Sequence, residues 1–270
     1  MQRAALEITL LAPIAGLLGA QIVLRHLAFF THGVGAATFP GLVVAGPAGV
    51  SPALAALGVG GAFGALLTRL GHRTSLATDA VTALLLVAAL AIGIVLASDV
   101  FDSAAAVDGL LFGSLLGIGA DELAWSCAAL LCALAGAAVY RRTWIATGFD
   151  PSSAPSLGLR TGASEWALAT VIAIAVVASV EAVGSLLVSA IFVVPAATVR
   201  LLAPSVLALE VGAAALALLE GLVGLLVAYR LDAPPGATIA VLGGAVFGAI
   251  LAVREIQGRS RRRTLEVAGT

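Results

Sequence analysis

The chain has 270 residues, of which 61% are hydrophobic and only 11% are charged, with a formal net charge of −1. Its polar residues form short clusters that separate apolar runs of about 17–25 residues, the length of a membrane-spanning helix. A water-soluble domain would need a polar face on each outer helix, and these runs have none. The composition therefore excludes a soluble protein and predicts an all-α, polytopic bundle of helices within a lipid bilayer.

Apolar runs bounded by polar residues, glycine or proline are the candidate spans. They lie at 6–24, 33–49, 52–69, 78–98, 123–140, 166–180, 184–199, 205–228 and 237–254. The run at 6–24 lacks the positive segment and cleavage site of a signal peptide, so we expect it to be the first span. The runs at 166–180 and 184–199 are short, and they represent either two spans or one span with a re-entrant piece, which gives nine spans or eight.

Arginine supplies all fourteen basic residues, and short cytoplasmic loops are expected to hold the positive charge. With the N-terminus outside, nine spans place these arginines inside: Arg25, Arg69, Arg73, Arg141, Arg142, Arg160, Arg200 and the tail from Arg254 to Arg263. The same count places these acidic residues outside: Asp99, Asp102, Asp108, Asp121, Glu122, Glu181 and Asp232. Only Arg3 and Arg230 disagree, so we prefer nine spans with the C-terminus in the cytoplasm.

Two connections are longer than a turn requires. The stretch 108–123 is apolar but too short to span, which predicts a re-entrant or interfacial helix pair. The stretch 147–165 contains Asp-Pro-Ser-Ser, a helix-start signal, and Leu157-Gly158, which suits a helix end. We expect a short amphipathic helix there, in a cytoplasmic loop of a transmembrane domain (1–256) that precedes a basic cytoplasmic tail (257–270).

Several motifs of soluble chemistry are missing from the sequence. Cys127 and Cys132 have neither a zinc nor a redox spacing, and no H-x-x-x-H or C-x-x-C is present. No G-x-x-x-x-G-K-[ST] loop is present either, so ATP hydrolysis by this chain is not expected and no bound cofactor is predicted. The pairs Gly60 with Gly64 and Gly244 with Gly248 are typical of closely packed membrane helices.

Four separated segments resemble the permease subunits of ABC importers for zinc, manganese and iron. They are VGSLLVSAIFVVPAATVR (183–200), LLFGSLLGIGADEL (110–123), FDPSSAPSLGL (149–159) and LDAPPGATIAVL (231–242). The first is the most specific, because its ending, Pro-Ala-Ala-Thr-x-Arg, is close to a signature of that family.

The resemblance implies a type II importer in a bacterial plasma membrane. Two permease subunits would lie side by side as a homodimer, above two cytoplasmic ATPase subunits that bind ATP, and an extracytoplasmic solute-binding protein would dock from outside. No nucleic acid is expected as a partner. The loop at 149–159 would be the coupling helix in a groove of the ATPase, with these contact residues: Phe149, Asp150, Pro151, Leu157 and Gly158.

The segment THGVGAATFPGLVVA (31–45) departs from the family pattern Gly-Asp-x-x-x-His-Ala that precedes Pro-Gly. His32 stands at the Asp position and Ala36 at the His position, so the acid–imidazole pair that suits manganese or zinc is missing. His32 is the one metal-ligand candidate left, and its alternative role is an interfacial or hydrogen-bonded side chain.

Membrane-depth polar residues and helix breakers are candidates for the translocation pathway. These are His32, Ser185, Ser189, Pro195 and Glu220. Pro195 interrupts a short span and is either part of a bent helix beside a cavity or a kink that serves packing alone. Asp79, Glu210 and Glu220 should each pair, face a cavity or sit at an interface; Glu220 is the better pathway candidate, against a plain helix–helix hydrogen bond.

The sequence therefore predicts a permease that imports a divalent metal by alternating access, powered by a separate ATPase. An ABC permease of the same fold for a non-metal solute is the alternative. An ion-coupled secondary transporter would need broken helices in two repeats, and only one broken segment is visible. An intramembrane protease would need a metal motif or a serine–histidine pair, and neither is evident.

Overall fold

Residues 1–71, 78–100, 113, 115–150, 154–159, 161–185 and 187–268 are described by a computed structural model. In these ranges the chain forms nine α-helices and no strand: α1 (Gln2–Leu24), α2 (Ala28–Ala48), α3 (Pro52–Gly71), α4 (Thr78–Val95), α6 (Ala120–Phe149), α7 (Thr161–Val183), α8 (Val188–Arg200), α9 (Val206–Leu231) and α10 (Pro235–Ala268). Three single turns add η1 (Leu96–Val100), η2 (Leu115–Gly117) and η3 (Ala154–Leu157). Each predicted span coincides with one α-helix, and the all-α prediction is confirmed.

Seven of the described helices are long and apolar enough to cross a membrane: α1, α2, α4, α6, α7, α9 and α10. Two shorter apolar helices, α3 and α8, complete the set. α8 has 13 residues, or about 20 Å of helix, which is less than the roughly 30 Å of a bilayer core. The turn before it, at Gly184 and Ser185, is buried among helices, as backbone at membrane depth must be.

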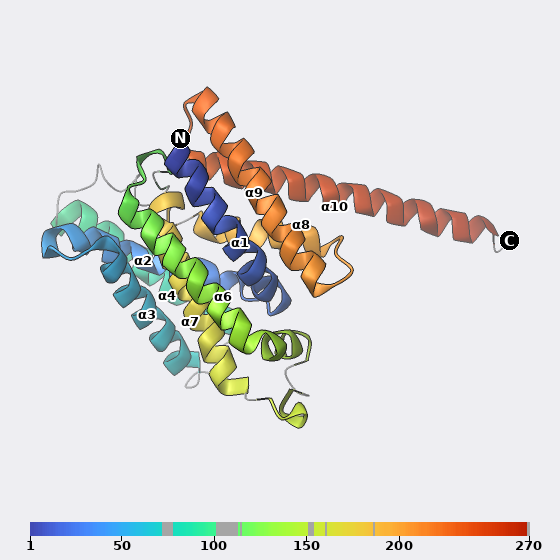
Figure 1. Ribbon diagram of the computed structural model, residues 1–270, viewed down its shortest axis with the longest axis horizontal. Coiled ribbons are helices and arrows are strands. Elements are labelled where there is room, and N and C mark those ends of the chain that lie inside the picture. Colours follow the sequence, from blue (N-terminus) through green and yellow to red (C-terminus); the bar gives the residue numbers. More distant parts are fainter. Residues whose placement is uncertain are drawn as a thin grey trace.

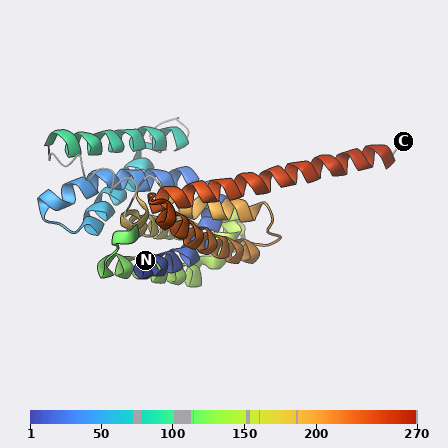
Figure 2. The same ribbon diagram turned by 90° about the horizontal axis from the view of Figure 1, so that it is seen from above.

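The bundle is built around α1, which packs most extensively against α9, α8 and α6. α2 packs against α3 and α4, and this group joins the rest through α7 and α8 (Figures 1 and 2). α10 packs along α8 and α9, and its second half extends beyond the bundle as helix, through residues 257–268.

Two glycines let α1 approach its neighbours closely. A Cβ atom on Gly16 would lie 2.4 Å from the carbonyl oxygen of Glu210, and one on Gly19 would lie 2.3 Å from that of Phe192. By contrast, Gly64, Gly244 and Gly248 have no atom within 4 Å of an added Cβ. Three of the four glycines singled out in the sequence therefore mark no close approach of helices in the described part of this chain, whereas Gly16 and Gly19 of α1 do.

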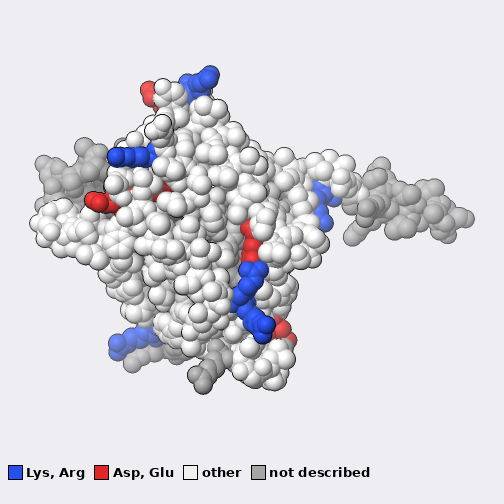
Figure 3. Space-filling model, in the orientation of Figure 1, with Lys and Arg blue, Asp and Glu red and all other residues white. Residues whose placement is uncertain are grey.

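The outer surface is apolar. Charged residues are sparse on the face shown in Figure 3, and most of that face carries neither sign of charge. Large side chains point outward along several helices, with Leu84 65% exposed on α4, Val139 72% on α6 and Val241 73% on α10. Such a surface is suited to lipid rather than to water.

Helix ends that the nine-span count places on the same side of the membrane lie together in the structure. The ends of α1, α6 and α8 and the start of α9 line one hollow, around Leu24, Phe149, Arg200 and Val206. The starts of α3 and α6 line another, around Pro52 and Glu122. The assignment of the first group to the cytoplasm stays a prediction from the arginine distribution.

The two long connections are described only in part. In 108–123, the described residues are Gly113 and 115–123, which form η2 and the start of α6; the rest of the predicted helix pair lies outside the described residues. Gly113 has φ +76°, and a Cβ atom on it would lie 2.4 Å from the carbonyl carbon of Val183. This connection therefore packs directly on the turn between α7 and α8.

Candidate functional site

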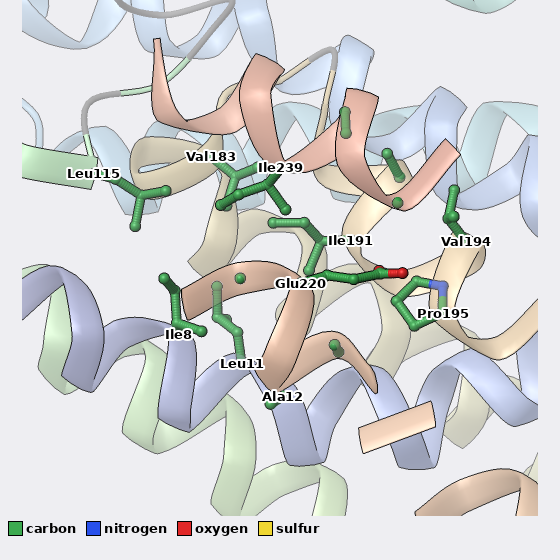
Figure 4. Close-up of a pocket in the computed structure, with 15 residues that line it drawn as sticks. Ile8, Leu11, Ala12, Leu115, Val183, Ile191, Val194, Pro195, Glu220 and Ile239 are labelled. Carbon is green, nitrogen blue, oxygen red and sulfur yellow. The ribbon is translucent and has the colours of Figure 1, made fainter. Parts of the chain in front are cut away.

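A narrow cavity lies between α1, α8, α9 and α10 (Figure 4). Its wall consists almost entirely of apolar side chains, including Leu11 of α1, Ile191 of α8 and Ile239 of α10. Pro195 and Glu220, two of the residues predicted for the pathway, both line it. The carboxyl of Glu220 is the polar side chain among its lining residues.

Glu220 is 5% exposed, near the middle of α9. Figure 4 shows its carboxyl beside the ring of Pro195. Its Oε1 atom has no hydrogen-bond partner among the described residues, and Oε2 would lie 3.1 Å from a Cβ atom added to Gly243. Because a lone buried carboxylate is costly, this group must be neutral, hydrated or bound to a cation.

Pro195 lies inside α8 and is buried. A proline has no N–H, so the carbonyl of Ile191, four residues earlier, loses its usual helical donor. Residues four apart share one face of a helix, and both of these line the cavity. The wall near Glu220 therefore carries hydrogen-bond acceptors and no side-chain donor among its lining residues.

A second group of predicted pathway residues lies away from this cavity. His32 of α2 and Ser189 of α8 are half-buried, and the Nδ1 atom of His32 is 3.0 Å from the Oγ atom of Ser189. Ser185 is fully buried, and its hydroxyl has no partner among the described residues. α2 reaches this turn at Gly35, where a Cβ atom would lie 2.9 Å from the Ser185 carbonyl oxygen.

The described residues of this chain do not form a metal-binding cage by themselves. Its described residues hold no group of three or more His, Cys, Asp or Glu side chains placed to bind a metal ion. Ala36 is fully buried one turn after His32, at the position where the family pattern has a histidine. One imidazole and one hydroxyl are fewer ligands than zinc or manganese requires.

Two polar pairs join helices within the bundle. The sequence predicts that Glu210 pairs, faces a cavity or sits at an interface, and the first of these holds: it forms an ion pair of 2.6 Å with Arg141. The second pair was not foreseen: Ser126 of α6 donates a 2.5 Å hydrogen bond to Glu7 of α1, and Glu7 is fully buried. A carboxyl at the start of the first apolar run is the signal that could have pointed to it.

The predicted ATPase-contact residues lie at one end of the bundle. Phe149 is the last residue of α6 and is 64% exposed, and Asp150 caps that helix in an extended conformation. Leu157 is 69% exposed at the end of η3, and Gly158 follows with φ +73°, the left-handed conformation of a C-terminal glycine. Pro151 and the start of the predicted amphipathic helix lie outside the described residues.

Arg25 anchors the same end of the bundle. It follows α1 and donates hydrogen bonds to the Trp144 carbonyl, at 2.9 Å, and to the Thr147 hydroxyl, both near the end of α6. Partial burial lowers the pKa of its guanidinium, and the negative charge of Glu165 opposes that effect. Arginine retains its charge under such conditions, so the contact is a charged one.

Known proteins match nearly the whole chain. The model of the ABC 3 transport family matches residues 1–254. The manganese import system permease protein ScaB of Streptococcus parasanguinis is 26% identical over 92% of this chain and 88% of its own length. The "Probable iron transport system membrane protein" of Haemophilus influenzae is 27% identical over 96% of this chain and 95% of its own length.

A solved structure shares the fold. PsaBC from Streptococcus pneumoniae in complex with Fab superposes with a TM-score of 0.83, over 92% of this chain and 90% of that chain, at 21% identity.

Proposed function

The chain belongs to the ABC 3 transport family, and we propose that it is the permease subunit of an ABC importer that carries a divalent metal ion, such as manganese, iron or zinc, into the cell. Two relatives with named cargo, one for manganese and one for iron, support this class of substrate. The single observation that carries the proposal is a family match over residues 1–254, which includes every helix of the bundle up to α10.

The energy source in this proposal is a separate cytoplasmic ATPase. The exposed side chains of Phe149 and Leu157 project at the end of α6 and in the loop that follows, which suits contact with a soluble partner. Arg25, after α1, and Arg200, the last residue of α8, lie near that loop, as the positive-inside rule expects of a cytoplasmic side. Arg254, inside α10, donates to the Leu201 carbonyl that follows α8. An extracytoplasmic binding protein would dock at the opposite end.

Alternating access in a homodimer would use the two polar groups differently. His32 binds Ser189 through Nδ1, which leaves Nε2 as the ring nitrogen for a cation. Glu220 lies inside the subunit, next to the backbone acceptor freed by Pro195, and can attract positive charge toward the middle of the helices. We therefore assign His32 with Ser189 and Glu220 to two separate polar positions, of which Glu220 lies inside the subunit.

A non-metal solute carried by the same architecture is the second candidate. The observation in its favour is the replacement of the family's acid and imidazole by His32 and Ala36, together with the lack of a three-ligand cluster in the described part of the chain.

Cellular metal content distinguishes the two candidates. Manganese, iron and zinc would be measured by mass spectrometry, under metal limitation, in a deletion strain complemented with the wild type or with Phe149→Ala/Leu157→Ala. We expect one metal to fall on deletion and to be restored by the wild type alone, with equal amounts of both proteins in the membrane. If no metal changes while the protein is expressed, the metal assignment is wrong.

A further inference from the structure

The corner between α1 and α2 is joined to α6, the helix that precedes the loop at 150–160, which we call the coupling loop after its proposed role. Arg25 lies at this corner, and its Nη2 atom donates to the Trp144 carbonyl and to the Thr147 hydroxyl. Thr147 in turn donates to the Thr143 carbonyl at 2.8 Å, so its oxygen is free to accept from Arg25. A cation at the C-terminal turn of a helix is also favoured by the helix dipole.

The same tryptophan joins the helices on both sides of the loop. Trp144 is 1% exposed, and its indole Nε1 donates to the Ser164 carbonyl, in the first turn of α7, at 3.0 Å. The loop at 150–160 therefore starts and ends on two helices that Trp144 holds together. Arg25 binds to this pair through the backbone of the tryptophan itself.

Charge and burial make this contact specific to arginine. Glu165, the residue after Ser164 in α7, attracts the Arg25 guanidinium. The Nε atom of Arg25 is buried without a partner among the described residues, so the side chain is held by its Nη2 contacts. A hollow lined by His26, Phe149 and Glu165 lies beside it, and the hydrogen bonds cross a place where side-chain packing is incomplete.

The corner continues directly into the helix of the polar site. Only Arg25, His26 and Leu27 separate α1 from α2, and His26 adopts φ +58°, a left-handed conformation that leaves the corner little freedom. α2 then carries His32, which contacts Ser189 of α8. Displacement of the ends of α6 and α7 would thus reach α2 through a short, constrained segment.

We propose that Arg25 is a positioning residue that transmits movement of the coupling loop to α2, so that ATP hydrolysis on the partner is converted into opening and closing at His32. The inference rests on the proposed function, because it requires a partner ATPase. In this proposal Arg25 controls the ratio of transport to ATP hydrolysis, and it does so without binding the metal.

The first experiment measures this ratio in proteoliposomes that contain the whole complex, with its ATPase and binding protein. Metal uptake and phosphate release would be compared for the wild type, Arg25→Ala, Arg25→Lys and Trp144→Phe, with Arg230→Ala as an exposed control. We expect Arg25→Ala to lower uptake per ATP hydrolysed by about twofold to thirtyfold, the range of couplings altered by single residues. Lysine should rescue this in part, since it keeps the charge but not the guanidinium geometry.

A proportional loss of uptake and hydrolysis in Arg25→Ala, with normal assembly, would overturn the inference, since it would show a structural role alone. An unchanged ratio in Arg25→Ala would do the same.

The second experiment needs no knowledge of the cargo. Phe29→Cys introduces a thiol at an exposed position in the first turn of α2, in a chain whose exposed cysteines are removed by Cys127→Ser and Cys132→Ser. We expect ATP to change the rate of thiol labelling at position 29 in the presence of Arg25 and to have little effect in Arg25→Ala. An equal ATP response in both chains refutes the role of Arg25. Absence of metal uptake by a wild type that shows this response would refute only the proposed metal cargo.

Discussion

Replacing Gly19 with alanine tests whether α1 and α8 touch as closely as the structure shows. The added Cβ would lie 2.3 Å from the carbonyl oxygen of Phe192 and 3.1 Å from the Cβ of Ala196. Since contacts of carbon are favourable only beyond about 3.5 Å, one helix must move by roughly 1 Å. The first contact is a backbone atom, so rotation of a side chain cannot relieve it.

The size of the effect follows from a comparison with Gly61→Ala. Gly61 lies in α3 and has no atom within 4 Å of an added Cβ. Both substitutions gain about 1 kcal/mol of helix propensity, but only Gly19→Ala incurs an overpacking cost of about 1–3 kcal/mol. We therefore expect the free energy of unfolding of Gly19→Ala to lie about 1–3 kcal/mol below that of Gly61→Ala.

Unfolding by sodium dodecyl sulfate in mixed micelles measures this difference on the purified chain. α8 also carries Pro195 and Ser189, so Gly19→Ala should reduce transport as well. Equal unfolding midpoints for Gly19→Ala and Gly61→Ala would refute the close approach of α1 to the backbone of α8.

Three further substitutions test other contacts. Ser126→Ala removes the hydrogen bond to buried Glu7 and should lower the free energy of unfolding by about 1–3 kcal/mol. Cys127→Ala changes an exposed neighbour and should leave the free energy of unfolding unchanged. Equal effects of the two substitutions would contradict the pairing of Ser126 with Glu7. Arg141→Ala leaves the buried Glu210 carboxyl without its ion-pair partner, so it should lower the free energy of unfolding by about 2–3 kcal/mol, more than Glu210→Gln does. The reverse order would exclude this ion pair as the cause. Gly158→Ala forces alanine to φ +73°, at a cost of about 1–2 kcal/mol, and should reduce ATP-driven uptake. Gly162→Ala, where an added Cβ has open space around it, should keep the wild-type rate of uptake. Loss of uptake in both variants would point to a different cause.

The helices could be predicted from the sequence because a bilayer demands runs of fixed length. The run at 237–254, for example, falls within α10, and the run at 205–228 begins at the N-cap residue of α9. Their ends were less accurate where a polar residue lies inside a helix: α1 begins at Gln2, so Glu7 is buried rather than terminal. Likewise α6 continues to Phe149, because Arg141 and Arg142 extend it past the apolar run instead of ending it.

The partners of these helices could not be predicted. A membrane helix is apolar on every side, so its periodicity does not identify the neighbouring helix. The contact of His32 with Ser189 joins residues 157 positions apart, and that of Arg25 with Thr147 joins residues 122 apart. The sequence predicts Pro195 and Glu220 as separate candidates, and only the packing of α1, α8, α9 and α10 brings them to one cavity.

The length of α6 has a consequence for where the proposed ATPase partner could bind. Thirty residues form about 45 Å of helix, roughly 15 Å more than the apolar layer of a bilayer. Its buried side chains run from Ser126 through Ala133 to Thr147, so the rest of the bundle supports it from one end almost to the other. α6 is therefore a long helix that its neighbours support along most of its length, and the loop after Phe149 begins at the end of this supported helix.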